Sequence, residues 1–173
     1  PIGTPDQIAQ FERLNAGRCA VGYQYRFHPV YREAADIIRD SPSVRFEAND
    51  DLLNRYGLDC LSVIAAHPID TVLWLLGPAA WVDIETDGRK VRGAIMHKSM
   101  AISDHLYRID TRPRTSIVEA GGRTWSLDAC NEMYLNALSA WLAWVGGAER
   151  DERTATLADG LAALEVMAQV RRI

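Results

Sequence analysis

The chain has 173 residues, of which 48% are hydrophobic and 24% are charged, a balance that predicts one globular domain with a sizeable core. Its net charge of -4 at pH 7 argues against a nucleic-acid partner or an anionic membrane surface, because either would need a basic face. Its apolar runs are interrupted before they reach the roughly 20 residues that a membrane span needs.

The first half of the chain alternates helical and strand-like segments. Residues 4–15 begin with Thr-Pro and place their apolar residues on one face, which predicts a helix. Residues 18–27 are predicted as a strand, residues 29–40 as a second helix and residues 43–48 as a short strand.

Residues 58–77 are the most apolar part of the chain. This stretch is too long for one strand and predicts a helix. Pro68 is expected to kink or restart that helix, because proline lacks the amide donor, and Gly77 followed by Pro78 is expected to end it.

The second half is first β and then helical. Residues 81–93 predict a hairpin that turns at Asp87-Gly88, residues 101–110 a further strand, and residues 115–127 a hairpin that turns at Gly121-Gly122. Two closing helices are predicted over 131–145 and 156–172. Their predicted apolar stripes are Tyr134, Leu138, Trp141, Leu142 and Val145 in the first, and Leu157, Leu161, Leu164 and Ala168, facing inward, in the second.

Grouped strands followed by helices favour an α+β fold, with an open, largely antiparallel sheet and helices packed on one face. Residues 1–24 look like a separate piece, because a helix followed by a strand fits the end of a doubly wound fold. We therefore expect a remnant over 1–24 and an α+β domain over 25–173. Trp81, Trp125 and Tyr107 lie on predicted strands, where they would face either a partner chain or the protein's own core.

Common catalytic and cofactor motifs are missing from the sequence. It has no glycine-rich phosphate loop and no Gly-x-Ser-x-Gly elbow, so we expect no dinucleotide site within this chain. His97 and His105 are expected to be surface or half-buried histidines, and we expect no metal site. Cys19, Cys60 and Cys130 have no paired spacing, which predicts reduced thiols and a cytoplasmic protein.

His67 is the strongest candidate for chemistry. It shares one helical face with Asp70 and Trp74, at spacings of three and seven residues. An imidazole titrating near neutrality can take the proton of a hydroxyl that is being oxidised. The alternative is a histidine that is hydrogen-bonded inside the fold and has no chemical role.

Four stretches, in this order, resemble the Gfo/Idh/MocA family of NAD(P)-dependent oxidoreductases. They are VGYQYRFHPVYREAADII, HPIDTVLWLLG, TSIVEAGGRTWSL, and MYLNALSAWLAWV followed by TLADGLAALEVMAQV. The second resembles the family's His-x-x-Asp helix, and the last contains an Asp-Gly-x-x-Ala-Leu pattern. The resemblance runs from about residue 1 to 171.

The resemblance implies a two-domain enzyme, of which this chain holds the C-terminal domain and the last helix and strand of the Rossmann domain. It implies NAD or NADP in the complete protein, a sugar, inositol or similar polyol as substrate, and a homodimer or homotetramer. It also implies His67 as the active-site histidine that carries a proton, with Arg26, Asp70 and Tyr25 at the substrate site.

Two departures from the family pattern keep other functions open. Val63 stands where the family usually has an aspartate four residues before the histidine, and a Glu-Lys-Pro motif would end at Pro1, so its lysine would precede this chain. We expect the substrate-side portion of an oxidoreductase. The alternatives are a catalytically silent binding or dimerisation module, and a cofactor-independent isomerase or lyase that uses His67 as a base.

Overall fold

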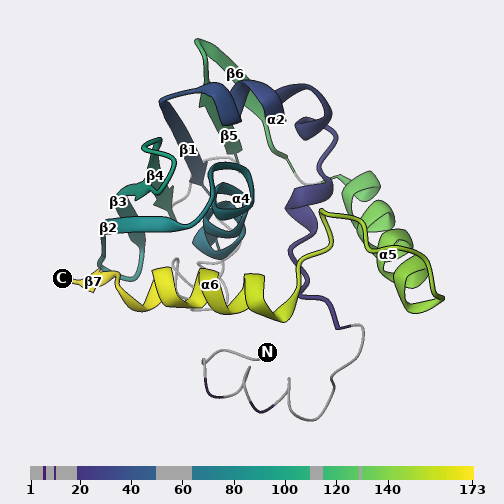
Figure 1. Cartoon of the computed structure of the whole chain (residues 1–173). Helices are drawn as coiled ribbons and strands as arrows, with labels where there is room; N and C mark the ends of the chain where they lie inside the picture. The colour runs from purple at the N-terminus through teal and green to yellow at the C-terminus, as the bar shows by residue number, and fades with distance from the viewer. Residues whose placement is uncertain (1–5, 7–9, 11–18, 50–63, 110–114, 129) are drawn as a thin grey trace.

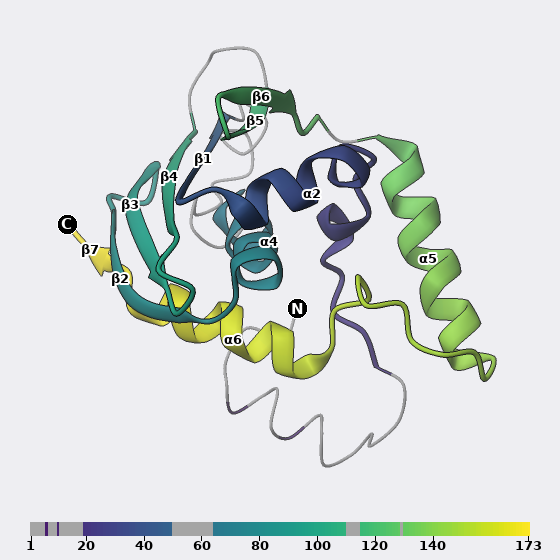
Figure 2. The same ribbon diagram turned by 45° about the horizontal axis from the view of Figure 1, so that its top comes forward.

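Seven strands form one mixed sheet, and the three helices that cover it lie on a single face (Figures 1 and 2). The computed structural model describes residues 19–49, 64–109, 115–128 and 130–173, together with Asp6 and Gln10. The strands are β1 (Ser43–Asn49), β2 (Ala79–Thr86), β3 (Lys90–His97), β4 (Ile102–Arg108), β5 (Thr115–Ala120), β6 (Arg123–Ser126) and β7 (Arg171–Arg172).

The strand order is β6-β5-β1-β4-β3-β2-β7. β1 pairs with β4 and β2 pairs with β7 in parallel, whereas all the other neighbours are antiparallel. The expected α+β fold with a largely antiparallel sheet is therefore confirmed. Both predicted hairpins are present, as β2–β3 around Asp87-Gly88 and β5–β6 around Gly121-Gly122.

The helical elements are η1 (Gln24–Phe27, a 3-10 turn), α2 (Tyr31–Asp40), α4 (Ala66–Leu76), α5 (Asn131–Val145) and α6 (Leu157–Ala168). Figure 2 shows α2, α4 and α6 on the same side of the sheet. Burying apolar surface between these layers is the main stabilising force of such a fold. Among the residues that make this core are Ala34, Ile38, Val44, Phe46, Ile69, Val72, Ile84, Ile95, Val118, Ala163 and Val166.

Helix α4 lies at the centre of the helical layer, against both α2 and α6. Pro68 is its third residue, and the first turn of a helix has no use for the missing amide, so proline is tolerated there. Gly77 ends the helix with a φ of 86°, a backbone conformation that favours glycine, and its amide donates to the carbonyl of Leu73.

Three expectations for particular segments are wrong, and one cannot be compared. The last helix, predicted over 156–172, ends at Ala168, and Arg171–Arg172 pair with β2 as β7. Residues 19–23 form no strand, because a strand needs a neighbouring segment to which its backbone is hydrogen-bonded. Among the described residues, one backbone hydrogen bond joins this segment to another part of the chain, from Val21 N to Ala155 O at 2.9 Å. Ala168, expected to face inward, is exposed in the last turn of α6. The helix predicted over 4–15 lies almost entirely outside the described residues.

Helix α5 stands apart from the rest of the helical layer (Figure 1). Met133 is its buried residue, and the predicted apolar stripe is solvent-facing throughout, from 36% exposed at Trp141 to 53% at Leu142. Of the three aromatic residues that the sequence analysis singled out on strands, Tyr107 is in the core, Trp125 packs partly against it, and Trp81 is 53% exposed. The sheet and α5 each therefore present apolar side chains to solvent.

Candidate functional site

His67 lies in the first turn of α4, beside two tyrosines from the segment that precedes and forms η1. Its ring is 4.9 Å from the ring of Tyr25 and 5.9 Å from the ring of Tyr23, centroid to centroid. The Nδ1 atom is buried and has no hydrogen-bond partner among the described residues. Burial lowers the pKa of His67 to about 4, so the imidazole is neutral at pH 7. A neutral ring with a free nitrogen can accept a proton or a hydrogen bond.

Arg26 in η1 and Asp70 in α4, three residues after His67, form a buried ion pair. Arg26 Nε donates to Asp70 Oδ2 at 2.8 Å and its Nη2 to Oδ1 at 2.5 Å, with side chains only 2% and 1% exposed. The same Nη2 lies 3.3 Å from Asp159 Oδ1 at the start of α6. Burial opposes the charge on Arg26, yet the hydrogen bonds of Asp70 keep the pKa of Arg26 above its ordinary value. The pair therefore joins η1, α4 and α6 at one point.

Thr156 and Asp159 cap the N-terminal end of α6. Thr156 Oγ1 accepts from the Asp159 amide at 3.3 Å, and Asp159 Oδ2 accepts from the Thr156 amide at 2.6 Å, which makes a capping box. The backbone and side-chain hydrogen bonds of Thr156 and the charge of Arg26 lower the pKa of Asp159, although its burial opposes the shift. The negative charge of Asp159 thus interacts both with the N-terminal end of α6 and with the Arg26 guanidinium.

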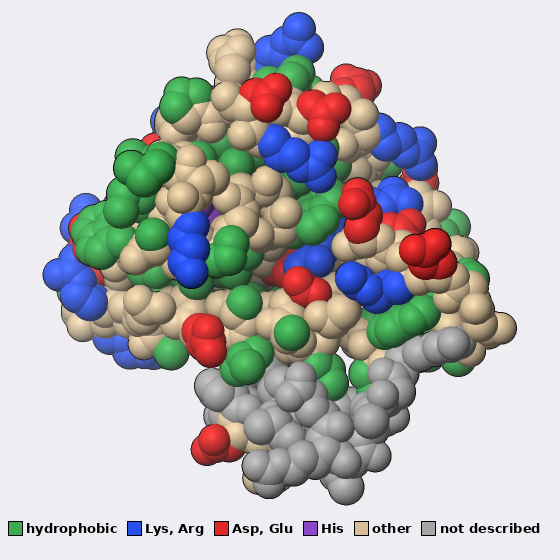
Figure 3. Space-filling model, viewed as in Figure 1, with side chains coloured by type: hydrophobic (Ala, Val, Ile, Leu, Met, Phe, Trp, Pro, Cys, Tyr) green, Lys and Arg blue, Asp and Glu red, His purple; other side chains and the backbone are tan. Residues whose placement is uncertain are grey.

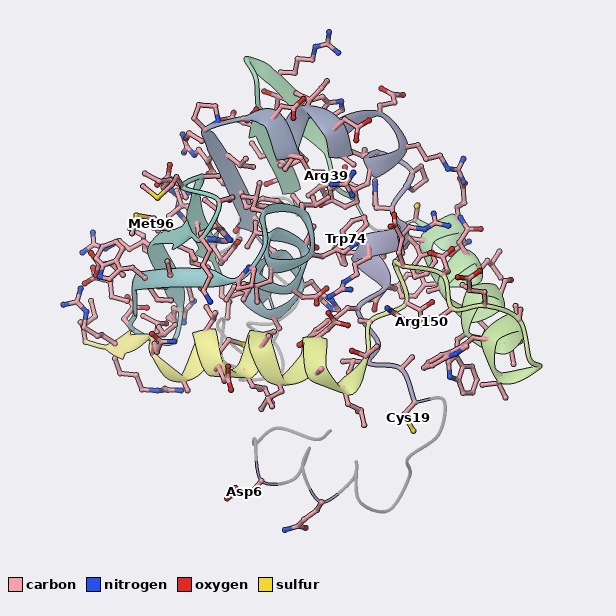
Figure 4. The ribbon with its side chains drawn as sticks, in the orientation of Figure 1. Asp6, Cys19, Arg39, Trp74, Met96 and Arg150 are labelled. Atoms are coloured by element: carbon pink, nitrogen blue, oxygen red, sulfur yellow. The ribbon has the colours of Figure 1, made fainter. Side chains whose placement is uncertain are left out.

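The other end of the predicted helical face is Trp74, which contacts arginines rather than His67. The guanidinium carbons of Arg26 and Arg39 lie 5.9 and 5.8 Å from its ring centroid, within the range of cation–π contacts. Figure 4 shows Trp74 and Arg39 between α4 and α2. Trp74 and Arg39 line a hollow of about 460 Å³ that has both acidic and basic side chains around it. Figure 3 shows acidic and basic side chains side by side on the face of the molecule seen in Figure 1.

A more apolar groove of about 530 Å³ runs between residues 19–24 and α5. Tyr23 lines this groove and also contacts His67 with the edge of its ring. Burial, followed by the charge of Asp70, raises the pKa of Tyr23 to about 12, so its hydroxyl stays protonated. Tyr23 therefore contacts both the histidine and the groove.

The structure brings all four predicted site residues together, but in different environments. His67 and Tyr25 are in contact, whereas Arg26 and Asp70 are bound to each other and almost inaccessible. Sequence reasoning missed Tyr23 and Asp159. The Thr-x-x-Asp pattern of a capping box was the available signal for Asp159. Val63, where the sequence departs from the family pattern, lies outside the described residues.

Metal and disulfide chemistry find little support in the described part of the chain. No group of three or more His, Cys, Asp or Glu among the described residues is placed to hold a metal ion. Cys19 and Cys130 are free thiols. His97 and His105 are fully buried, at 0% and 2% exposure, which corrects the expectation of surface or half-buried rings, because both find hydrogen-bond partners inside the core.

Comparison with known proteins gives a clear fold match and no sequence match. No family model and no curated protein matches the sequence. The WlbA (WbpB) dehydrogenase of Thermus thermophilus, crystallised with NAD and UDP-GlcNAcA, matches 96% of this chain with a TM-score of 0.76 and 16% identity. UDP-N-acetylglucosamine 3-dehydrogenase GnnA of Acidithiobacillus ferrooxidans matches 98%, at 0.73 and 16%. A putative myo-inositol dehydrogenase of Sinorhizobium meliloti 1021 matches 95%, at 0.68 and 17%.

These likenesses confirm the fold that the sequence resemblance implied. The chain spans 60% of the length of the first of these structures and 66% of each of the other two. No helix in the described part of the chain is long and apolar enough to cross a membrane.

Proposed function

We propose that this chain is the substrate-side portion of an NAD(P)-dependent oxidoreductase of the Gfo/Idh/MocA family, acting on a hydroxyl or keto group of a sugar, inositol or similar polyol. The observation that carries the proposal is His67, a neutral imidazole with a free buried nitrogen, in a fold shared with sugar and inositol dehydrogenases. The protein is proposed to act in the cytoplasm.

The residues of this chain do not fit a dinucleotide by themselves, because the sequence offers no glycine-rich turn that could cradle a pyrophosphate. The NAD or NADP would be held by another part of the complete protein, and when bound it would supply the hydride acceptor or donor. Titration of the 173-residue chain with NADH or NADPH should therefore give no measurable change in fluorescence. Tight binding would contradict the proposal that another part of the complete protein holds the cofactor.

His67 is proposed to exchange the hydroxyl proton of the substrate. Its lowered pKa makes it a base that is already deprotonated at pH 7, and the ring of Tyr25 limits the directions from which a substrate can approach. Arg26 and Asp70 are proposed to serve the substrate site by holding α4 in place, since their charges satisfy each other. Tyr25 is the better candidate for direct contact with substrate.

The test is His67→Gln in the complete protein. Loss of a positioned base lowers turnover by roughly 10²–10⁴-fold, while the melting temperature should hardly change because Nδ1 makes no hydrogen bond with the described residues. Asp104→Asn, an exposed change on β4, is the control and should leave both quantities unaltered. A large drop in melting temperature with His67→Gln would instead identify a core histidine without a chemical role.

A catalytically silent module is the second candidate, favoured by Val63 in place of the usual aspartate. The free Nδ1 of His67 agrees with the loss of such a carboxylate partner. The two candidates differ in one measurement: the complete protein would bind polyols or sugars in both cases, but would reduce NAD(P) with them only in the first.

We also propose a homodimer or homotetramer that assembles through the outer face of the sheet. Trp81, Met96 and Ile102 lie directly opposite one another across β2, β3 and β4, with Trp81 53% and Ile102 42% exposed. Light scattering should give an oligomeric mass for the natural sequence and a smaller mass for Trp81→Glu. Lys98→Glu, at an exposed turn, should keep the oligomeric mass.

A further inference from the structure

A line of buried polar side chains crosses the core from the end of α4 to β4. His97 Nδ1 lies 2.7 Å from the carbonyl oxygen of Gly77, and its Nε2 lies 2.9 Å from Ser103 Oγ. Ser103 Oγ lies 2.9 Å from His105 Nε2, and His105 Nδ1 lies 2.5 Å from the hydroxyl of Tyr107. All four side chains belong to residues that are at most 2% exposed.

The Gly77 carbonyl sets the direction of every bond in this line, because a carbonyl oxygen can only accept. His97 must therefore donate from Nδ1, and its neutral ring then accepts at Nε2 from the Ser103 hydroxyl. Ser103 Oγ in turn accepts from His105 Nε2, which leaves His105 Nδ1 to accept from Tyr107. We infer that these residues form one hydrogen-bond chain of fixed direction, which holds His97 and His105 in opposite neutral tautomers and reverses when His97 takes up a proton.

The reversed state follows from the same geometry. If His97 gains a proton, its Nε2 becomes a donor and Ser103 Oγ must accept from it. The Ser103 hydroxyl then donates to His105 Nε2, so the His105 proton is on Nδ1 and donates to the oxygen of Tyr107, whose own hydroxyl hydrogen turns away from the ring. No bond of the chain is lost, and the charge stays on His97. Protonation of one histidine therefore changes the tautomer of another that it does not touch.

His97 is the better place for the added charge. It lies at the C-terminal end of α4, where the helix dipole and the last carbonyl groups favour a cation. The Gly77 hydrogen bond raises the pKa of His97, although burial outweighs it and lowers the pKa overall. Burial, and then the charge of His97, lower the pKa of His105 to about 3. At neutral pH the chain is thus in its uncharged state.

The elements packed around the chain present no competing charge among the described residues. The inward-facing residues beside it are Phe46 on β1, stacked on His105 at 6.0 Å, and Val91 and Ile95 on β3. The carboxylate of Asp70 on α4 is held by Arg26. The charged residues of β3 and β4 alternate with the buried ones and so face the other side of the sheet: Lys90, Arg92, Asp104 and Arg108.

The consequence concerns the helix that carries His67. The chain ties the carbonyl of Gly77, the residue directly after α4, to β4 through groups that respond together when His97 is protonated. This role rests on the placement of the groups and holds whether or not the proposed oxidoreductase function is correct.

Nitrogen-15 NMR of the intact chain tests the inference directly. Multiple-bond correlations at pH 7.5 should find the ring proton on Nδ1 of His97 and on Nε2 of His105, and any other pair of tautomers overturns it. As the pH is lowered, the His105 proton should move to Nδ1 with the same midpoint as the protonation of His97. Loss of the fold before His97 titrates would overturn the reversed state.

Two serine variants provide a matched comparison. Ser103→Ala removes the middle of the chain, so the tautomer of His105 should no longer follow the state of His97. Ser99→Ala removes a hydroxyl that also ties the end of α4, through a 2.8 Å bond to the Leu76 carbonyl, but lies outside the chain. It should leave both tautomers unchanged. Equal behaviour of the two variants would overturn the inference.

Discussion

The buried pair of Arg26 and Asp70 gives the sharpest prediction for stability. Its two hydrogen bonds of 2.8 and 2.5 Å are almost inaccessible to water. Asp70→Ala would leave the Arg26 guanidinium buried with the 3.3 Å contact to Asp159 as its one ion pair among the described residues, and such a poorly compensated charge costs about 3–5 kcal/mol. That is a large share of the roughly 5–15 kcal/mol that stabilises a typical domain.

Urea unfolding followed by circular dichroism measures this cost. The matched control is Glu85→Ala, which breaks the equally short contact between Arg92 and Glu85, where Arg92 is 58% exposed. We expect about 0–1 kcal/mol for this control, because solvent screens the surface pair. The double change Arg26→Met with Asp70→Leu should recover most of the loss of Asp70→Ala, since it removes both charges.

The outcome also separates two roles for these residues. A loss below about 1 kcal/mol for Asp70→Ala would refute the reasoning, because it would mean that Arg26 reaches water or finds another anion. Arg26 and Asp70 would then be free to contact substrate directly. A loss near the expected value supports their role in fixing η1, α4 and α6 around His67.

Three further predictions concern other parts of the fold. Burial lowers the pKa values of His67 and His105 to about 4 and about 3, and it raises the pKa of Asp70 to about 6. Below pH 6.5 the unfolded chain therefore gains two histidine protons, while the folded chain gains the Asp70 proton and offsets one of them. The free energy of unfolding should fall by up to about 1.4 kcal/mol per pH unit between pH 6 and 4, and urea curves for His67→Gln should show a shallower dependence. Gly93→Ala should prevent folding or lower the melting temperature severely, because its Cβ would lie 2.0 Å from the Asp83 carbonyl oxygen and its φ is 142°. In the control Gly88→Ala the added Cβ meets no atom within 4 Å, so the expected loss is about 1 kcal/mol, and equal losses for the two variants would contradict this reasoning. Thr156→Ala should cost about 0.5–2 kcal/mol in urea unfolding through loss of the α6 cap, and no measurable loss would show that the cap is not needed.

The elements that the sequence predicts well are those with strong local signals. Gly77 followed by a proline ended α4, and Asp87-Gly88 and Gly121-Gly122 placed both hairpins, because these residues accept backbone angles that others rarely adopt. Alternation and helical spacing were enough for the α+β class. The strand predicted at residues 19–23 is absent because these residues carry no such local signal. Their strand-like composition forms a strand only if another strand pairs with them.

The sequence by itself determined that His67, Asp70 and Trp74 share one helix, and that the chain contains no phosphate loop. Only the tertiary structure decided what each of them contacts. It turned Asp70 towards Arg26, placed Tyr23 and Tyr25 against His67, and fully buried two histidines that were expected to be at the surface or half-buried. The physical reason is that burial and hydrogen-bond partners set whether an ionisable group holds the fold together or remains available for chemistry, and those partners come from residues far apart in the sequence.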